Sequence, residues 1–221
     1  MAHKSSQFAF ENHILEAFKA RDLKKAQWSE GLHHVVPHEH LSHISLHYQH
    51  AQYHLILFWI ENLFTNAARW LGVRELARLS LDYIENNPFH TDDYIAHAEH
   101  FIEVISAKNK NIQVAQLEAL MRCGLACWKV RSSAWKFESE STLKDSFQNI
   151  KKQIEMGQMA FVPSLGEWSV YELWQASTFG KLESSSGESD VWVVRRDNEL
   201  TLSYERWTPQ HYQQVISNQR L

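Results

Sequence analysis

Glycine and proline are scarce in this chain, and their scarcity limits the folds open to it. The 221 residues include 7 glycines and 4 prolines, less than half of the usual combined share of about 12%. Tight turns depend on these two residue types, so a chain that lacks them favours long helices over many short strands. Hydrophobic residues make up 44% of the chain and charged residues 22%, which is typical of a globular protein with a buried core.

Hydrophobic periodicity predicts two long helices at the start of the chain. Apolar residues recur at helical spacing over 6–26 and over 39–71, and residues 29–38 form a connection between them. The run from Leu55 to Ile60 is apolar on every side of the helix. Such a run is typical of a helix that other elements surround.

Two further helices and a polar connection complete the first half. Gly72 fits the C-terminal end of the 39–71 helix. An amphipathic helix then runs up to Pro88, and Thr91 fits the N-cap of the next one. The polar run 108–111 consists of two lysines and two asparagines, and it marks a predicted domain boundary.

The second half mixes helices with short strands. Helices are predicted over 112–135 and 147–154, and short strands over 159–162 and 169–174. Nearer the C-terminus, the apolar runs 191–195 and 200–204 flank Asp197 and Asn198, which predicts a β-hairpin. Thr208 and Pro209 then open a last helix.

These elements predict an α+β fold in two parts. An all-helical domain is expected over 1–107. A smaller domain with helices and a short antiparallel β-sheet is expected over 108–221.

Charge, cysteine content and hydropathy exclude several classes of protein. The formal net charge is −4, which argues against a nucleic-acid partner. Cys123 and Cys127 lie four residues apart, and we interpret them as small buried residues on one helix face. The longest apolar run is far shorter than the roughly 20 residues that span a bilayer, and the start of the chain lacks the pattern of a signal peptide. We therefore expect a cytoplasmic protein without a membrane partner.

Histidines are crowded into one short segment. His43, His47, His50 and His54 follow each other at helical spacing and would fall within an arc of roughly 40°. Imidazoles four residues apart can chelate a divalent metal if a further ligand completes the site. The alternative is a polar flank beside an apolar stripe. A metal-binding protein or metalloenzyme is therefore an alternative hypothesis, whereas the preferred interpretation gives this chain no metal of its own.

No catalytic centre is predicted. Asp93, His97 and His100 form a second set at helical spacing, but Asp93 also suits a helix N-terminus. Glycine-rich phosphate loops and the Gly-x-Ser-x-Gly nucleophile motif do not occur in the sequence. We therefore predict that this chain has no catalytic residues.

The predicted hairpin is rich in aromatic residues and is the best candidate for a binding site. A two-stranded unit can leave an edge that accepts a peptide as an added strand. Tryptophan and tyrosine also make strong anchor positions at interfaces. The predicted peptide-binding residues are Val191, Trp192, Val193, Arg195, Leu200, Leu202, Tyr204 and Trp207.

Residues spread over nearly the whole chain resemble those of a known family in their order and spacing. In the first half they are Tyr48, Ile56, Ile60, Phe64, Gly72, Leu76, Tyr83, Pro88, Thr91 and Phe101. In the second half they are residues 162–165, 170–174 and 191–195, and Tyr212. By the order and spacing of these residues, the chain resembles the HvfC/BufC family, and within it the MbnC-type partner subunits of methanobactin biosynthesis.

The resemblance implies a partner protein without catalytic residues. Members of this family pair with a TIM-barrel enzyme that holds several iron ions, and the pair modifies cysteine in a ribosomally made precursor peptide. In the methanobactin case the products are an oxazolone and a thioamide. The iron belongs to the enzyme subunit, so this chain would have no cofactor of its own. It would dock the enzyme as a heterodimer and bind the leader of the precursor. Some family members have been labelled DNA-binding regulators, which leaves a transcriptional regulator as a second alternative.

Overall fold

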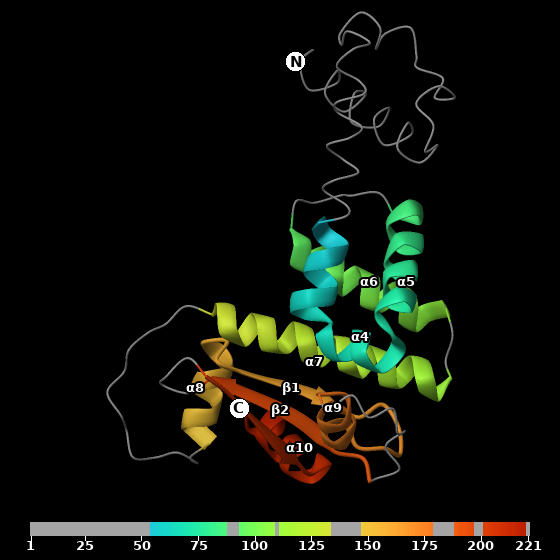
Figure 1. The fold of residues 1–221 in the computed structure, drawn as a ribbon. Coiled ribbons are helices and arrows are strands. Elements are labelled where there is room, and N and C mark those ends of the chain that lie inside the picture. The colour runs from blue at the N-terminus through green and yellow to red at the C-terminus, as the bar shows by residue number, and fades with distance from the viewer. Residues whose placement is uncertain are drawn as a thin grey trace, which may run out of the picture.

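A helical layer, a long central helix and a small sheet form the described part of the chain (Figure 1). The computed structural model describes residues 54–87, 93–108, 111–133, 147–178, 188–196 and 201–219. Most of these residues are helical, and the three strands near the C-terminus form one antiparallel sheet. The predicted α+β fold is confirmed.

The predicted helix over 39–71 is interrupted within its buried part. Residues 54–58 are α-helical and continue into a π-helix, η1 (Trp59–Leu63), before α4 (Thr65–Leu71) begins. Phe64 lies between them with φ −113° and ψ 29°, and its N–H donates to the Trp59 carbonyl. The wider turn lets Trp59, Leu63 and Phe64 all be buried. A single continuous α-helix is therefore a wrong prediction for this segment.

Two helices follow as the periodicity predicts. Gly72 ends α4 with φ 98°, a conformation that glycine adopts without strain. The next helices are α5 (Val73–Asn86) and α6 (Tyr94–Lys108). The cap of α6 is Asp93, whose Oδ1 accepts hydrogen bonds from the N–H groups of Ile95 and Ala96. Thr91, the expected cap, lies outside the described residues.

Helix α7 (Ile112–Ser132) is the centre of the fold. It packs against η1, α4 and α6 on one side and against the sheet on the other (Figure 1). Gly124 sits at the crossing with η1, where an added Cβ would lie 1.7 Å from the Leu63 carbonyl oxygen. The predicted boundary at 107/108 falls just before Lys108, the last residue of α6, and the larger buried cluster includes residues on both sides of it.

The sheet has the strand order β1-β2-β3 and is antiparallel throughout. Its strands are β1 (Met159–Pro163), β2 (Val191–Arg196) and β3 (Leu202–Trp207). The predicted hairpin is confirmed as the pairing of β2 with β3, and residues 197–200 between them lie outside the described residues.

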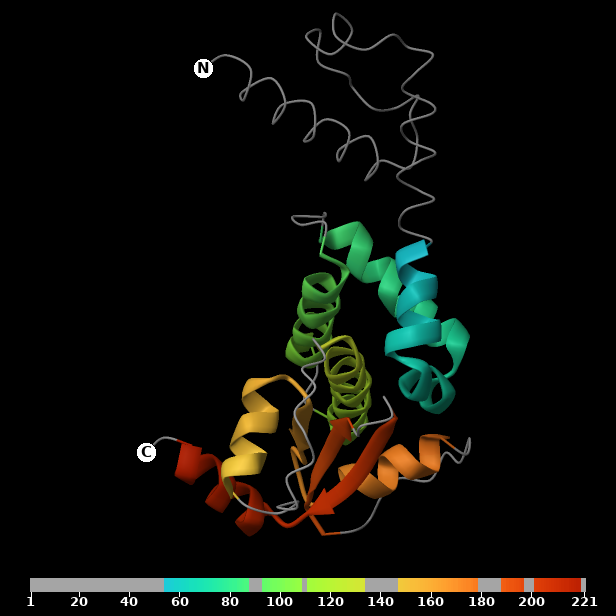
Figure 2. The same cartoon turned by 90° about the vertical axis from the view of Figure 1, so that its left-hand side faces the viewer.

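The two faces of the sheet are covered by different helices (Figure 2). Trp192 and Val194 face α7 and belong to the larger buried cluster. Val193, on the opposite face, belongs to a second cluster. That cluster also includes residues of α8 (Phe147–Glu155) and α10 (Pro209–Gln219).

Residues 169–174 do not form the predicted strand. Ser169 instead caps α9 (Val170–Thr178), since its Oγ accepts a hydrogen bond from the Glu172 N–H at 3.0 Å. The β-branched and aromatic residues that suggested a strand, Val170 and Tyr171, form the first turn of this helix. A good N-cap and buried contacts with α7 override their strand preference.

Candidate functional site

The outer edge of β3 offers backbone groups for pairing. The Arg196 N–H donates to the Gln158 carbonyl, and the Ser164 N–H donates to the Asp190 carbonyl. The backbone groups of residues 190, 192, 194 and 196 therefore point toward β1, and those of the alternate residues of β2 point toward β3.

The same alternation decides which groups of β3 point outward. Residues 203, 205 and 207 of β3 pair with residues 195, 193 and 191. The N–H and C=O groups of Leu202, Tyr204 and Arg206 consequently point away from the sheet. No backbone hydrogen bond joins these groups to another described residue. Three consecutive outward positions of β3 are thus free within the part of the chain that the structure describes.

The opposite edge of the sheet is less suited to pairing. By the same alternation, Met159, Phe161 and Pro163 of β1 point their backbone groups outward. Pro163 has no N–H to donate, and proline is a common device for blocking a sheet edge. The edge of β3 therefore has the fuller set of donors and acceptors.

An aromatic cluster flanks the edge of β3. The ring of Tyr204 is stacked on that of Trp192 with centroids 5.6 Å apart, and Trp174 lies 5.0 Å from Trp192. Tyr204 keeps 40% of its surface exposed, so its ring is open to a partner. Burial, together with the neighbouring Cys127 thiol, raises the pKa of Tyr204 to about 12. The phenol therefore remains a neutral hydrogen-bonding group at physiological pH.

Only part of the predicted peptide-binding set lies at this edge. Leu202 and Tyr204 are at outward positions of β3. Leu200 lies outside the described residues. Trp207 is 7% exposed and belongs to the second buried cluster. Arg206, which the predicted set omits, is at an outward position.

The predicted residues of β2 are placed differently. Val191, Trp192 and Val193 lie in the central strand, with 1%, 0% and 0% of their surface exposed. Their strand is paired on both sides, so they form the core beneath the edge and offer nothing to an added strand. The Arg195 Nε lies 3.1 Å from Glu205 Oε1, at ion-pair distance although not aligned for a hydrogen bond. Periodicity alone does not distinguish the outer strand of a hairpin from the central one.

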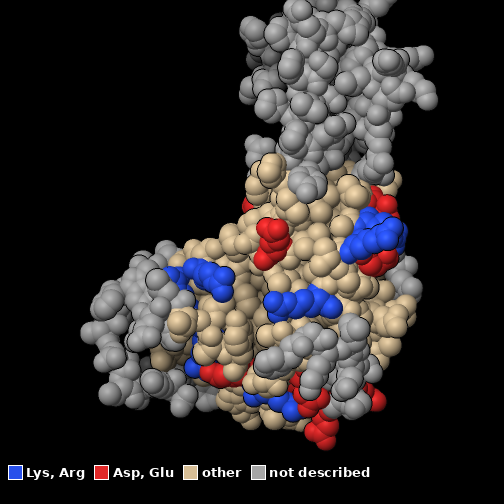
Figure 3. Space-filling model, viewed as in Figure 1, with Lys and Arg blue, Asp and Glu red and all other residues tan. Residues whose placement is uncertain are grey.

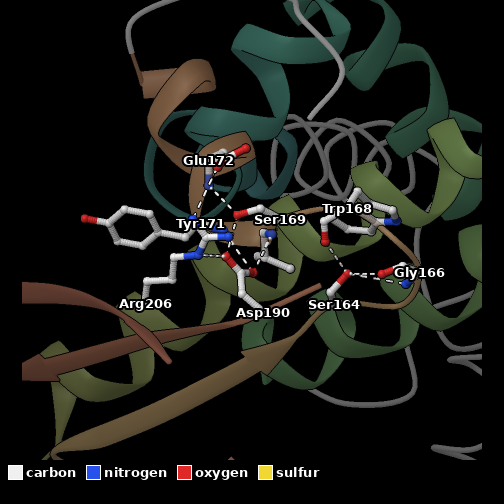
Figure 4. A network of polar contacts seen from close by, with 9 residues as sticks. Ser164, Gly166, Trp168, Ser169, Tyr171, Glu172, Asp190 and Arg206 are labelled. Carbon is white, nitrogen blue, oxygen red and sulfur yellow. Dashed lines mark hydrogen bonds and ion pairs between the residues drawn. The ribbon is translucent and has the colours of Figure 1, made fainter. Parts of the chain in front are cut away.

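A buried carboxylate organises the end of β3 (Figure 4). Asp190 is 3% exposed and accepts hydrogen bonds from the Ser169 hydroxyl and from the Val170 N–H, the latter at 2.8 Å. The Arg206 Nε lies 2.9 Å from Asp190 Oδ2, and the Arg206 Nη1 lies 3.3 Å from Glu172 Oε1. This network attaches the N-terminus of α9 to both strands.

A cavity of about 810 Å³ opens beside this network. It lies where β2 begins, β3 ends and α10 begins. Its lining residues are Glu167, Glu188, Ser189, Asp190, Arg206, Trp207, Thr208, Pro209 and Gln210.

The histidine sets do not form a metal site within the described residues. His43, His47 and His50 lie outside them, and His54 begins the first described helical turn. In the second set, Asp93 caps α6, as its alternative role predicts. Its companion His97 is 5% exposed. His100 Nδ1 lies 2.8 Å from the Tyr83 hydroxyl. Among the described residues, no group of three or more His, Cys, Asp or Glu side chains could hold a metal ion.

The two cysteines are free and lie in the interior of α7, as the sequence predicts. Cys123 is buried, and Cys127 is half-buried beneath Tyr204. Burial raises the pKa of Cys127 to about 12. Both thiols therefore stay protonated at neutral pH, where a thiol is a poor nucleophile.

The surface carries both signs of charge. On the face shown in Figure 3, acidic and basic side chains of the described residues alternate, and no continuous basic surface is visible among them. This distribution agrees with the formal net charge of −4.

No protein-family model, curated protein or solved structure matches the chain. Within the described residues, none of the helices combines the length and the apolar character needed to cross a membrane.

Proposed function

We propose that this chain is a non-catalytic partner subunit that binds the leader of a ribosomally made precursor peptide at the outer edge of β3. The observation that supports this proposal most directly is the set of outward backbone groups on Leu202, Tyr204 and Arg206. A leader in extended conformation would add a fourth strand to the sheet. The resemblance to the HvfC/BufC family favours the same role.

The edge can supply both affinity and selectivity. Each backbone hydrogen bond contributes about 0.5–1.5 kcal/mol net, so several bonds together give a moderate affinity before side chains contribute. The exposed ring of Tyr204 adds a contact surface, because aromatic side chains pack well against a cross-strand neighbour. Leu202 extends this surface at the other end of the edge.

In this proposal the chemistry belongs to a second subunit. That subunit is a TIM-barrel oxidase with several iron ions, and it converts cysteine of the precursor to oxazolone and thioamide groups. The present chain docks the enzyme in a cytoplasmic heterodimer and holds the leader. Holding the leader raises the effective concentration of the cysteine segment at the enzyme.

Two substitutions of Tyr204 test the strand-addition step. Tyr204→Ala removes the ring and keeps the outward N–H, whereas Tyr204→Pro removes both. We expect Tyr204→Pro to bind the leader at least tenfold more weakly than Tyr204→Ala, since proline removes a donor and restricts the strand. The measurement is fluorescence anisotropy with the labelled leader of a methanobactin-type precursor peptide.

The fold of both variants is checked by circular dichroism and thermal unfolding. Proline at an outward position of an edge strand leaves the β2–β3 hydrogen bonds intact, so both variants should fold. Equal affinities for two folded variants would contradict strand addition at β3.

A further inference from the structure

The acidic side chains at the end of β3 are not all used by the fold. Asp190 and Glu172 are ion-paired with Arg206. Glu167 and Glu188 also line this cavity and are exposed, and neither makes a hydrogen bond or an ion pair with another described residue. Among the described residues, the cavity at the end of β3 therefore has two carboxylates without an ion-pair partner, whereas its one guanidinium, that of Arg206, is already paired.

We infer that this cavity receives a lysine or arginine side chain of the bound leader. The inference rests on the proposed function, because the free edge of β3 is what brings an extended peptide to the cavity. The charges of the lining residues decide which kind of side chain the cavity favours. Three carboxylates and one guanidinium line the cavity, so an anionic or apolar side chain would be disfavoured there, and a cationic one would pair with Glu167 and Glu188.

The register of the edge places the basic residue along the leader. The existing strands are all antiparallel, and an added strand continues that pattern most simply. One leader residue then lies opposite Tyr204. The leader residue two positions before it lies opposite Arg206, and the one four positions before it lies opposite Thr208. Because a strand advances about 3.4 Å per residue, the cavity is reached about two to four residues before the residue opposite Tyr204.

The cavity and the edge therefore divide the recognition of the leader. The backbone bonds of β3 accept any extended segment without proline at the paired positions. The carboxylates fix the direction of the segment, since a basic residue at its opposite end would lie far from the cavity and would gain nothing from it.

A charge-matched pair of double variants tests this inference. Glu167→Gln/Glu188→Gln removes the two unpaired carboxylates. Glu61→Gln/Glu155→Gln makes the same change in net charge at exposed positions of η1 and α8, away from the cavity. The probe is the labelled leader peptide, titrated against each full-length variant at about 50 mM and about 500 mM salt.

We expect the cavity variant to bind the leader roughly tenfold more weakly at low salt and the control variant to match the wild type. At high salt the gap should close, because screening weakens exposed ion pairs. A leader with its N-terminal lysine and arginine residues replaced by glutamine should lose the same factor. When the changed leader is tested with the cavity variant, the two losses of affinity should not add, because both changes remove the same interaction.

Two results would overturn the inference. The first leaves the proposed function standing, and the second does not. If wild type binds the leader and the cavity variant binds it equally well, the cavity does not take a basic side chain, while docking at β3 stands. If wild type does not bind the leader at all, the proposed function fails together with the inference.

Discussion

At the scale of single residues, Asp190 joins three parts of the chain through one carboxylate. It receives hydrogen bonds from Ser169 and Val170 at the start of α9 and an ion pair from Arg206 of β3. A negative charge at a helix N-terminus is favourable, and the guanidinium compensates for the burial of the carboxylate. Asp190 thus joins the start of α9 to β3 beside the proposed peptide site.

Loss of this carboxylate should therefore destabilise the protein. Asp190→Ala removes the acceptor of the Ser169 hydroxyl and the Val170 N–H and one of the two carboxylates paired with Arg206, and we expect a loss of about 3 kcal/mol in the free energy of unfolding. The measurement is urea denaturation followed by tryptophan fluorescence. Glu188→Gln, an exposed neighbour, is the control and should change stability by less than about 0.5 kcal/mol. Equal stabilities of the Asp190 variant and the control would contradict this role.

Raised pKa values at four side chains predict a loss of stability in alkali. Burial raises the pKa of Tyr83, Tyr204 and Cys127 to about 12, and it raises that of Cys123 well above its ordinary value. In the unfolded chain these groups release their protons near their ordinary pKa values, from about pH 9 for cysteine and about pH 10 for tyrosine. The folded state holds the protons longer, so stability is full below about pH 9 and falls as pH rises toward 12.

The measurement is the melting temperature between pH 8 and pH 12. The double variant Tyr204→Phe/Cys127→Ala removes two of the four groups, and we expect its melting temperature to fall less steeply over this range. A fall as steep as that of the wild type would show that these two groups do not contribute.

At the scale of elements, the contact between α7 and η1 depends on a glycine. A Cβ at position 124 would overlap the Leu63 carbonyl, so the two helices approach more closely than any other residue would allow. The close crossing holds the sheet and the helical layer on opposite sides of α7.

Replacing glycine by alanine usually stabilises a helix, but at position 124 we expect it to destabilise the protein. Alanine favours an exposed helix by up to about 1 kcal/mol relative to glycine, yet Gly124→Ala should lower the stability by about 2 kcal/mol or more, because the backbone of Leu63 must move. Gln113→Ala, on the exposed start of α7, is the control and should be neutral. Stabilisation by Gly124→Ala in chemical denaturation would refute the close crossing.

The sequence predicts most elements of this fold because their patterns are local. The amphipathic stripes of α5 and α6, the cap formed by Asp93 and the paired runs of the hairpin each lie within a few turns of chain. The strand predicted over 169–174 rests on the β-branched and aromatic types of Val170 and Tyr171, although Ser169, three residues before Glu172, is a local cap that favours a helix. The second partner of this helix start, Asp190, lies about twenty residues away in sequence. The break at Phe64 lies beside the close approach of Leu63 to Gly124, a contact between residues far apart in sequence.

The candidate site could be predicted only in part for the same reason. Alternation marks the hairpin, but it does not say that β2 pairs with β1 and so becomes the buried central strand. Tyr204 and Leu202 lie at the free edge, whereas Val193 does not. The cavity beside Arg206 combines residues of three separate segments, and no local pattern joins them.

At the scale of the whole molecule, the helical layer and the sheet share one buried cluster through α7. Strand β3 lies on the other side of α7 from the helices α5 and α6 (Figure 1). The cavity is lined by residues where β3 ends and α10 begins. The proposed leader site thus leaves the helical layer available to an enzyme subunit. A partner subunit of this kind would bring peptide and enzyme together without supplying a catalytic group.

Co-expression tests whether the chain forms a complex with both an enzyme and a precursor peptide. The chain carries an affinity tag and is expressed with the proposed iron enzyme and precursor peptide, and the mass and iron content of the eluted complex are measured. We expect a stable complex of all three chains that contains iron, and loss of the precursor alone from the complex when Tyr204→Pro is used. Elution of the folded chain by itself, without enzyme or precursor, would contradict the account.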